Sequence, residues 1–320
     1  MVIRLFLNNR VWVLLFLPFV LSLYILGDNL GMDFPFGKAE QSSLILPFFS
    51  SISWVQSGAH IVMILVNAVL LNWVFNSNEF LEKNTFMISL LYIIISSFFQ
   101  HWGASSWLFV AHLFCILGLW ILIGIKPQQS AKKPAFNAGV IFGLSLFFEP
   151  KYFFLLPIVL LLLVNARGFH LRELILLIVG FFLPMGFYWA TSYLTGSNLA
   201  TLNVLPNKYY DANWKEVSIL AFLLLMLFFS IAGLRARLAK ASLRLKKQTQ
   251  LLTIFMFYIV LLGSLTFFWG GDTTLLSLIS IPFSFYFTYA LLSSSLGVSS
   301  HLFFYILLSF SLFKYMLFYF

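Results

Sequence analysis

The chain has 320 residues, of which 61% are hydrophobic and only 9% are charged, and its mean hydropathy is +0.97. This composition excludes an ordinary soluble domain, in which about a quarter of the residues are charged. The net charge of +9 does not indicate a nucleic-acid partner, because the basic residues stand in short loops without a binding motif. The lone Cys115 excludes a disulfide framework and a cysteine-based metal site.

Nine apolar segments are long enough to cross the roughly 30 Å of membrane hydrocarbon. They are predicted at residues 11–27, 58–75, 86–101, 106–125, 173–195, 218–234, 251–268, 275–293 and 301–320. Between the fourth and fifth, residues 137–165 hold two short apolar runs broken by Glu149-Pro150-Lys151, which predicts a hairpin of two short helices. The predicted fold is therefore all-α: a polytopic integral membrane helical bundle of about nine full spans plus this hairpin, with no soluble domain.

The loops between these spans alternate in charge. Fourteen of the 19 Lys and Arg residues fall in alternate loops, with three acidic residues, and the heaviest cluster lies in the predicted loop 235–250. The other loops hold four basic and seven acidic residues. Basic residues near span ends stay cytoplasmic during insertion, so a multi-pass protein of a bacterial inner membrane with a cytoplasmic N-terminus is predicted. Lys314, within the last span, is expected to extend to the interface.

The predicted outer loop 28–57 holds two candidate functional acids, Asp28 and Asp33, directly after the first span. Each is either an ordinary turn residue beside Gly and Asn, or a catalytic or ligand-binding carboxylate. Residues 42–56 of the same loop are expected to form interfacial helices. The second large outer loop, 196–217, adds Lys208 as a candidate, and Asp272 is expected to cap the helix after a tight turn.

The hairpin tip holds a second candidate group, Glu149 and Lys151. One interpretation is a simple ion pair that caps the turn, and the other is a Lys151 ammonium aimed at a lipid phosphate with Glu149 orienting it. Three histidines within or near spans, His60, His101 and His112, lack the close spacing of a metal site and are expected to serve in packing or at the interface. His101 is also kept as a candidate substrate-binding residue.

This outline resembles the GT-C superfamily, which comprises polytopic glycosyltransferases that use polyprenyl-phosphate sugar donors. The resemblance rests on a first span, a long outer loop that opens with acids, and the stretch from Asn137 to Leu162. That stretch is similar to the family's small-residue helix, a Lys at the outer turn and a short Leu-rich helix. The resemblance to the superfamily covers residues 1–195, which would form a GT-C-like membrane core. Residues 196–320 would then be additional C-terminal membrane helices. The chain lacks an adjacent acidic pair in its first outer loop and an outer soluble domain.

The resemblance implies that Asp28 or Asp33 acts as general base on an acceptor hydroxyl, or helps to hold a divalent cation. It does not decide whether this protein binds a metal. It also implies that Lys151, with Glu149, Lys208 and His101 nearby, binds the donor, a polyprenyl-phosphate-linked sugar at the outer face. Two alternatives remain. One is a non-catalytic membrane subunit or scaffold of an envelope assembly or secretion system, with membrane-protein partners. The other is a transporter of a lipid-linked substrate. Membrane lipid is an expected partner in every case.

Overall fold

The computed structural model describes residues 6, 11–29, 53–81, 84–99, 107–126, 129–196, 214–239, 241–292 and 298–319, and all regular structure in these residues is helical. This confirms the predicted all-α class. The elements are η1 (Val11–Leu15), α2 (Phe16–Asn29), α4 (Ser53–Ser77), α5 (Met87–Ser96), α6 (Leu108–Ile123), α7 (Lys132–Ser145), η2 (Pro150–Leu155), α8 (Leu156–Arg167), α9 (Leu171–Thr195), α10 (Trp214–Ala239), α11 (Leu243–Gly270), α12 (Thr274–Ser277), α13 (Ser280–Leu292) and α14 (Val298–Tyr319).

Within the described residues, six helical stretches are long and apolar enough to cross a membrane, so the chain is a helical membrane protein. They are Gly58–Ser77, Pro150–Arg167, Leu171–Thr195, Glu216–Arg235, Leu243–Gly270 and Thr274–Leu292. Four further apolar helices have 10–17 residues: Trp12–Gly27, Met87–Ser96, Leu108–Ile123 and His301–Lys314. All ten coincide with predicted spans or with the second half of the predicted hairpin, although four are shorter than a full crossing requires.

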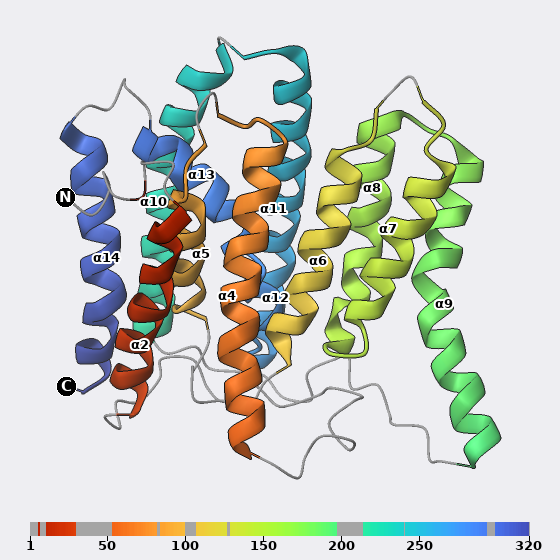
Figure 1. Ribbon diagram of the computed structural model, residues 1–320, viewed down its shortest axis with the longest axis horizontal. Coiled ribbons are helices and arrows are strands. Elements are labelled where there is room, and N and C mark those ends of the chain that lie inside the picture. Colours follow the sequence, from red (N-terminus) through yellow and green to blue (C-terminus); the bar gives the residue numbers. More distant parts are fainter. Residues whose placement is uncertain are drawn as a thin grey trace.

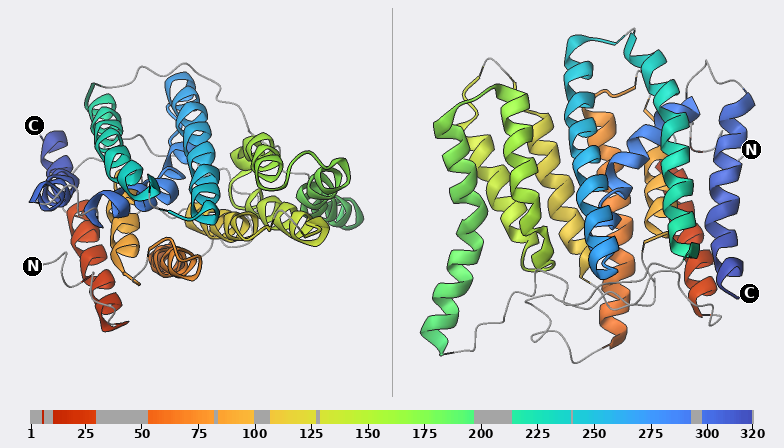
Figure 2. Two further views of the ribbon diagram at one scale, coloured as in Figure 1. Left: turned by 90° about the horizontal axis from the view of Figure 1, so that it is seen from above. Right: turned by 180° about the vertical axis from the view of Figure 1, so that it is seen from behind.

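The helices stand roughly side by side and alternate in direction (Figures 1 and 2). At one side of the bundle α7 packs against α6 and α9, and at the other α14 packs against α2, α5, α10 and α13. α13 lies between α5 and α10, and 94% of the Thr274–Leu292 stretch is buried inside the protein. Helices from both sides of residue 196 therefore share one bundle, and the division of the chain at that residue stays a prediction.

Most basic residues of the described ranges lie in or next to the turns α6–α7, α8–α9 and α10–α11, which are at the upper end of the bundle in Figure 1; we call it the basic end. These basic residues are Lys126, Lys132, Lys133, Arg167, Arg172, Arg235, Arg244, Lys246 and Lys247. The predicted loop 235–250 is wrong in extent, because α10 continues to Ala239 and α11 already begins at Leu243. Lys and Arg are good helix formers whose long stems reach water from a helix end, so the helices extend into the basic cluster.

Three glycines bring α7 and α9 into backbone contact. A Cβ atom built on Gly139 would lie 2.2 Å from the carbonyl oxygen of Leu177, and one on Gly143 would lie 2.2 Å from that of Phe181. A Cβ on Gly180, in α9, would lie 2.5 Å from the carbonyl oxygen of Phe136. Small residues four apart allow membrane helices to approach closely, and this spacing fixes the position of the hairpin that begins with α7.

The predicted helix boundaries in the hairpin and the single span at 275–293 need correction. α7 begins at Lys132, before the predicted start of the hairpin at residue 137, and ends at Ser145, before the turn at Glu149. The span at 275–293 is interrupted, because α12 ends at Ser277 and α13 begins at Ser280. Pro282 has no N–H to donate to the Leu278 carbonyl oxygen, which accepts a hydrogen bond from Ile281 N instead. The break leaves hydroxyl groups of Ser277 and Ser280 inside the bundle.

The expectation that Lys314 extends to the interface is wrong. Its side chain is completely buried, and the ammonium donates a hydrogen bond to the carbonyl oxygen of Ser97, just past the C-terminus of α5. The same nitrogen lies 5.4 Å from the ring centroid of Tyr24 and 5.3 Å from that of Phe98. The negative end of the α5 dipole and two ring faces thus surround this cation.

Candidate functional site

An ion pair between two distant segments lies at the end of the bundle opposite the basic end. The Lys151 ammonium, on η2, is 3.1 Å from Asp272 Oδ2, in the turn between α11 and α12. The side chains are 14% and 9% exposed, so the pair is mostly withdrawn from solvent but not sealed. This arrangement joins the tip of the predicted hairpin to the start of the interrupted span.

Local hydrogen bonds between carboxylates and nearby backbone N–H groups hold the turns that carry Lys151 and Asp272. Glu149 precedes η2 in an extended conformation, and its carboxylate accepts the backbone N–H of Lys151 at 3.4 Å, while Pro150 starts the helix. On the other side, α11 ends at Gly270, and the next residue, Gly271, has a φ of +68°, the left-handed conformation that favours glycine. Asp272 Oδ1 then accepts the N–H of Thr274 at 3.1 Å, as a residue at a helix N-terminus does.

Two carboxylates contact this turn. Asp272 pairs with the Lys151 ammonium, and Glu149, which is 5% exposed, accepts the backbone N–H of Lys151. Burial strengthens electrostatic interactions, so this site favours groups that donate hydrogen bonds or carry positive charge next to the carboxylates. A hydroxyl group of a polar substrate can donate such a hydrogen bond.

A buried polar network continues from this site into the bundle. The ring of Tyr152 stacks on that of His112, with centroids 6.5 Å apart. His112 Nδ1 lies 3.0 Å from the Tyr92 hydroxyl, and His112 Nε2 lies 3.0 Å from the hydroxyl of Ser277. Four elements, α5, α6, η2 and α12, therefore meet at one imidazole, and all four side chains are buried.

Comparison with protein families gives one match. The model of a family of unknown function, DUF6427, matches residues 42–319. The chain belongs to the DUF6427 family. No curated protein and no solved structure matches it. The range that this DUF6427 chain shares with its family includes Glu149, Lys151 and Asp272, whereas Asp28 and Asp33 precede it.

The structure locates two of the six predicted site residues of the DUF6427 chain, Glu149 and Lys151, and brings them together. Asp28 lies in the last turn of α2, but its side chain is outside the described residues, as are Asp33, His101 and Lys208 altogether. α2 packs against α5 and α14, whereas η2 packs against α7, α8 and α12. The proximity of Asp28 or Asp33 to Lys151 therefore stays a prediction.

The interpretation of the hairpin tip as a Glu149–Lys151 side-chain pair is corrected. Glu149 binds the backbone of Lys151, and the ammonium binds Asp272 instead. The sequence reasoning identified Asp272 only as a helix cap, although its position after a Gly-Gly turn already placed a carboxylate at this end of the bundle. The packing role expected of His112 is confirmed, but its partners were not foreseen.

A metal site is not evident in the part of the chain that the structure describes, where no three His, Cys, Asp or Glu side chains come together. The divalent cation implied by the resemblance was expected beside the first outer loop. Most of that loop, including Asp33, lies outside the described residues. This expectation therefore stays a prediction.

The hydrogen bond between Tyr92 and His112 gives a stability prediction. Phenylalanine at Tyr92 keeps the ring but removes the hydroxyl, which leaves Nδ1 of the buried His112 without that partner. We expect a loss of about 1–3 kcal/mol in the free energy of unfolding, measured by SDS titration of the purified protein. Tyr193→Phe is the matched control, because Tyr193 is 87% exposed. Equal stability of the two variants would contradict a structural role for the hydroxyl.

Proposed function

We propose that the protein lies in a bacterial inner membrane with the basic end in the cytoplasm. The support is the concentration of Lys and Arg residues at the helix ends that lie together at the basic end, which is the pattern of cytoplasmic loops. In this orientation the chain crosses the membrane about nine times in addition to the hairpin. Lys151 and Asp272 then face the periplasmic side.

We further propose a GT-C-like glycosyl transfer from a polyprenyl-phosphate-linked sugar at this outer face. The observation that carries the proposal is the Lys151–Asp272 pair, which places an ammonium and carboxylates at the tip of the hairpin. In the reaction, the oxygen of an acceptor hydroxyl bonds to the anomeric carbon of the sugar and the bond from that carbon to the phosphate oxygen breaks. Polyprenyl phosphate leaves with the electron pair, and the acceptor proton passes to a carboxylate.

The residues present suit these two roles. Lys151 is the cation that stabilises the charge developing on the leaving phosphate. The carboxylates available as proton acceptors are Asp272 and Glu149, which the structure describes, together with Asp28 and Asp33, which the resemblance suggests. The Asp272 carboxylate beside Lys151 suits an acceptor hydroxyl, which hydrogen-bonds to a carboxylate before its proton is removed.

Binding of undecaprenyl phosphate to the purified protein tests this function directly. Native mass spectrometry in detergent should show binding above that of phosphatidylcholine, and Lys151→Gln should weaken it roughly tenfold, because a charge-assisted phosphate contact is lost. Lys246→Gln, which removes the same charge at the basic end, is the control. Unchanged binding by Lys151→Gln, or no preference over phosphatidylcholine, would overturn the proposal.

A transporter of a lipid-linked substrate is the second candidate, and the interrupted helix α12–α13 favours it. Discontinuous helices that expose polar groups inside a bundle often form transporter binding sites. Here the break lies beside the His112 network and within a stretch that is 94% buried. Movement of fluorescent undecaprenyl phosphate between the leaflets of proteoliposomes, without transfer of sugar, would favour this function over the transferase.

A further inference from the structure

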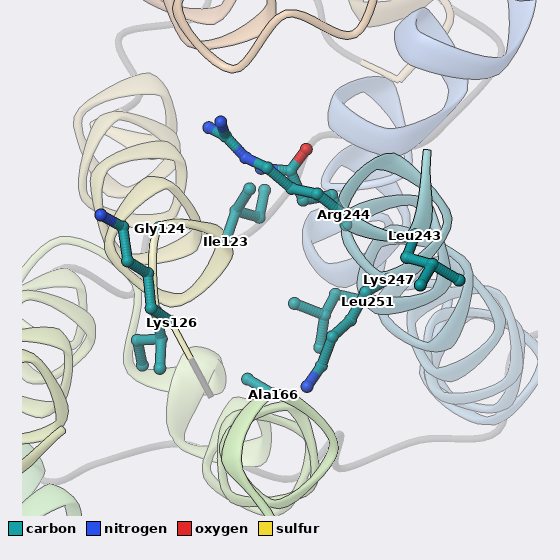
Figure 3. Close-up of a pocket in the computed structure, with 10 residues that line it drawn as sticks. Ile123, Gly124, Lys126, Ala166, Leu243, Arg244, Lys247 and Leu251 are labelled. Atoms are coloured by element: carbon teal, nitrogen blue, oxygen red, sulfur yellow. The ribbon is translucent and has the colours of Figure 1, made fainter. Parts of the chain in front are cut away.

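A pocket of about 550 Å³ opens between α6, α8 and α11 at the basic end (Figure 3). Three cationic side chains line it: Lys126 after α6, and Arg244 and Lys247 in the first turns of α11. Figure 3 shows Arg244 extending from α11 across the pocket and Lys247 extending towards Ala166 of α8. The remaining lining is mostly apolar: Ile123, Gly124, Ile125, Ala166, Leu243 and Leu251, with Gln248 as the other polar residue.

Positive charge accumulates at this pocket without compensation from the described residues. The first turn of α11 contains no acidic residue, so the positive end of its dipole adds to the charges of Arg244 and Lys247. None of the three cations ion-pairs with a carboxylate in the described ranges. Arg167 differs, because its Nε lies 3.4 Å from Glu173 Oε2. The pocket thus has the electrostatic character of an anion site.

Gln248 supplies a second, independent feature that points to a ligand. Its side chain is 4% exposed, and its Nε2 donates to Asn78 Oδ1 at 3.3 Å. Its carbonyl oxygen Oε1 is buried and accepts no hydrogen bond from the residues that the structure describes. A buried acceptor of this kind is costly unless a donor reaches it, so a ligand with a hydrogen-bond donor beside its anionic group suits the site.

We propose that this pocket binds the head group of an anionic phospholipid that carries hydroxyl groups, of the phosphatidylglycerol type. The phosphodiester lies among Lys126, Arg244 and Lys247, and a glycerol hydroxyl donates to Gln248 Oε1. The acyl chains leave along the apolar wall that includes Leu243, which is 85% exposed, and Leu251. Basic pockets between membrane helices at a cytoplasmic surface bind anionic head groups in this manner.

Native mass spectrometry of the purified full chain with phosphatidylglycerol tests the charge requirement. We expect Lys247→Gln and Arg244→Gln each to reduce binding about fivefold, the change expected for one basic residue at a membrane surface. Lys246→Gln is the matched control, because Lys246 is on the same turn of α11 but does not line the pocket. Equal losses in all three variants would overturn the site, since they would show only a general attraction of the basic end.

The same experiment distinguishes a lipid from a soluble anion. Competition by glycerol 1-phosphate or inorganic phosphate at micromolar concentration would overturn the lipid assignment and show a site for a soluble phosphate. Phosphatidylglycerol binding that resists both anions supports it. The Lys151→Gln variant should bind phosphatidylglycerol as the wild type does, so a failure of the transferase proposal leaves this test intact.

The hydroxyl requirement has its own test. The wild type should prefer phosphatidylglycerol to phosphatidic acid, which lacks the glycerol head group, and Gln248→Met should remove this preference. Gln250→Met, an exposed position on the same helix, should retain it. The ratio of the two lipids is the readout, so a general loss of stability does not imitate the result. An unchanged ratio in Gln248→Met would overturn the role of Gln248, and if that variant does not fold, the Lys247→Gln comparison still decides the site.

Discussion

Alanine at Gly143 is expected to destabilise the protein by about 1–3 kcal/mol, the usual cost of overpacking a tight contact. Its added methyl group would lie 2.2 Å from the Phe181 carbonyl oxygen, and this atom belongs to the backbone of α9, so a whole helix must move. The double variant Gly139→Ala/Gly143→Ala should lose more stability, because both added methyl groups then clash with backbone atoms of α9. Thermal unfolding in detergent, followed by tryptophan fluorescence, measures both effects.

Gly186→Ala is the control for this prediction. Gly186 lies on α9 as well, but a Cβ atom there meets nothing within 4 Å. Alanine has the higher helix propensity, by up to about 1 kcal/mol, so this variant should be as stable as the wild type or slightly more stable. If Gly143→Ala were equally stable, the close approach of α7 and α9 would be contradicted, and with it the position of the hairpin that carries Lys151.

Asparagine at Asp272 is expected to produce the second large effect, a loss of about 2 kcal/mol. The Asn side chain still accepts the N–H of Thr274, so the turn is retained and only the counter-charge of Lys151 is removed. Loss of one partner of a fully buried pair costs about 3–5 kcal/mol. The expected value is lower here because the Lys151 side chain keeps 14% exposure. SDS titration of the purified variant gives the free energy of unfolding.

The double variant Lys151→Gln/Asp272→Asn separates the ion pair from other effects. When both charges are removed, no unpaired charge remains, and part of the stability should return. The coupling between the two positions should then lie within about 0.5–3 kcal/mol. Losses that simply add in the double variant would show that the two side chains do not interact, and would remove the structural basis for a shared site.

Hydropathy was sufficient to predict the helices but not their contacts. The apolar runs predicted the positions of the apolar helices in the described residues, because the membrane requires about 20 apolar residues whatever their neighbours are. The second half of the hairpin was predicted as a short helix, but Pro150–Arg167 is long and apolar enough to cross. Helix ends were less predictable, since Arg235 and Arg244 extend helices that hydropathy alone would stop. The break in the helix at Ser277–Ser280 left no clear signal in the sequence, where Pro282 is the only hint.

The candidate site was predictable only in part, because hydropathy does not show which helices contact one another. Lys151 and Glu149 stood out because charged groups between apolar runs are rare, but a partner as distant in sequence as Asp272 depends on tertiary packing. The His112 network is similar: each member is an ordinary buried residue by itself, and only the meeting of α5, α6, η2 and α12 makes them a group. Asn67 of α4 is another case, because its amide donates to the Phe109 carbonyl oxygen of α6 at 2.7 Å.

The buried ammonium of Lys314 has a consequence for the biogenesis of the protein. A cation within an apolar helix opposes transfer of that helix from the translocon into lipid. Its partners, Tyr24, Ser97 and Phe98, belong to segments that the ribosome delivers long before α14. α14 therefore enters a bundle that already holds these binding groups, and a chain that misplaces α2 or α5 offers no stable position for Lys314. Lys314 thus makes the placement of α14 depend on the correct placement of α2 and α5.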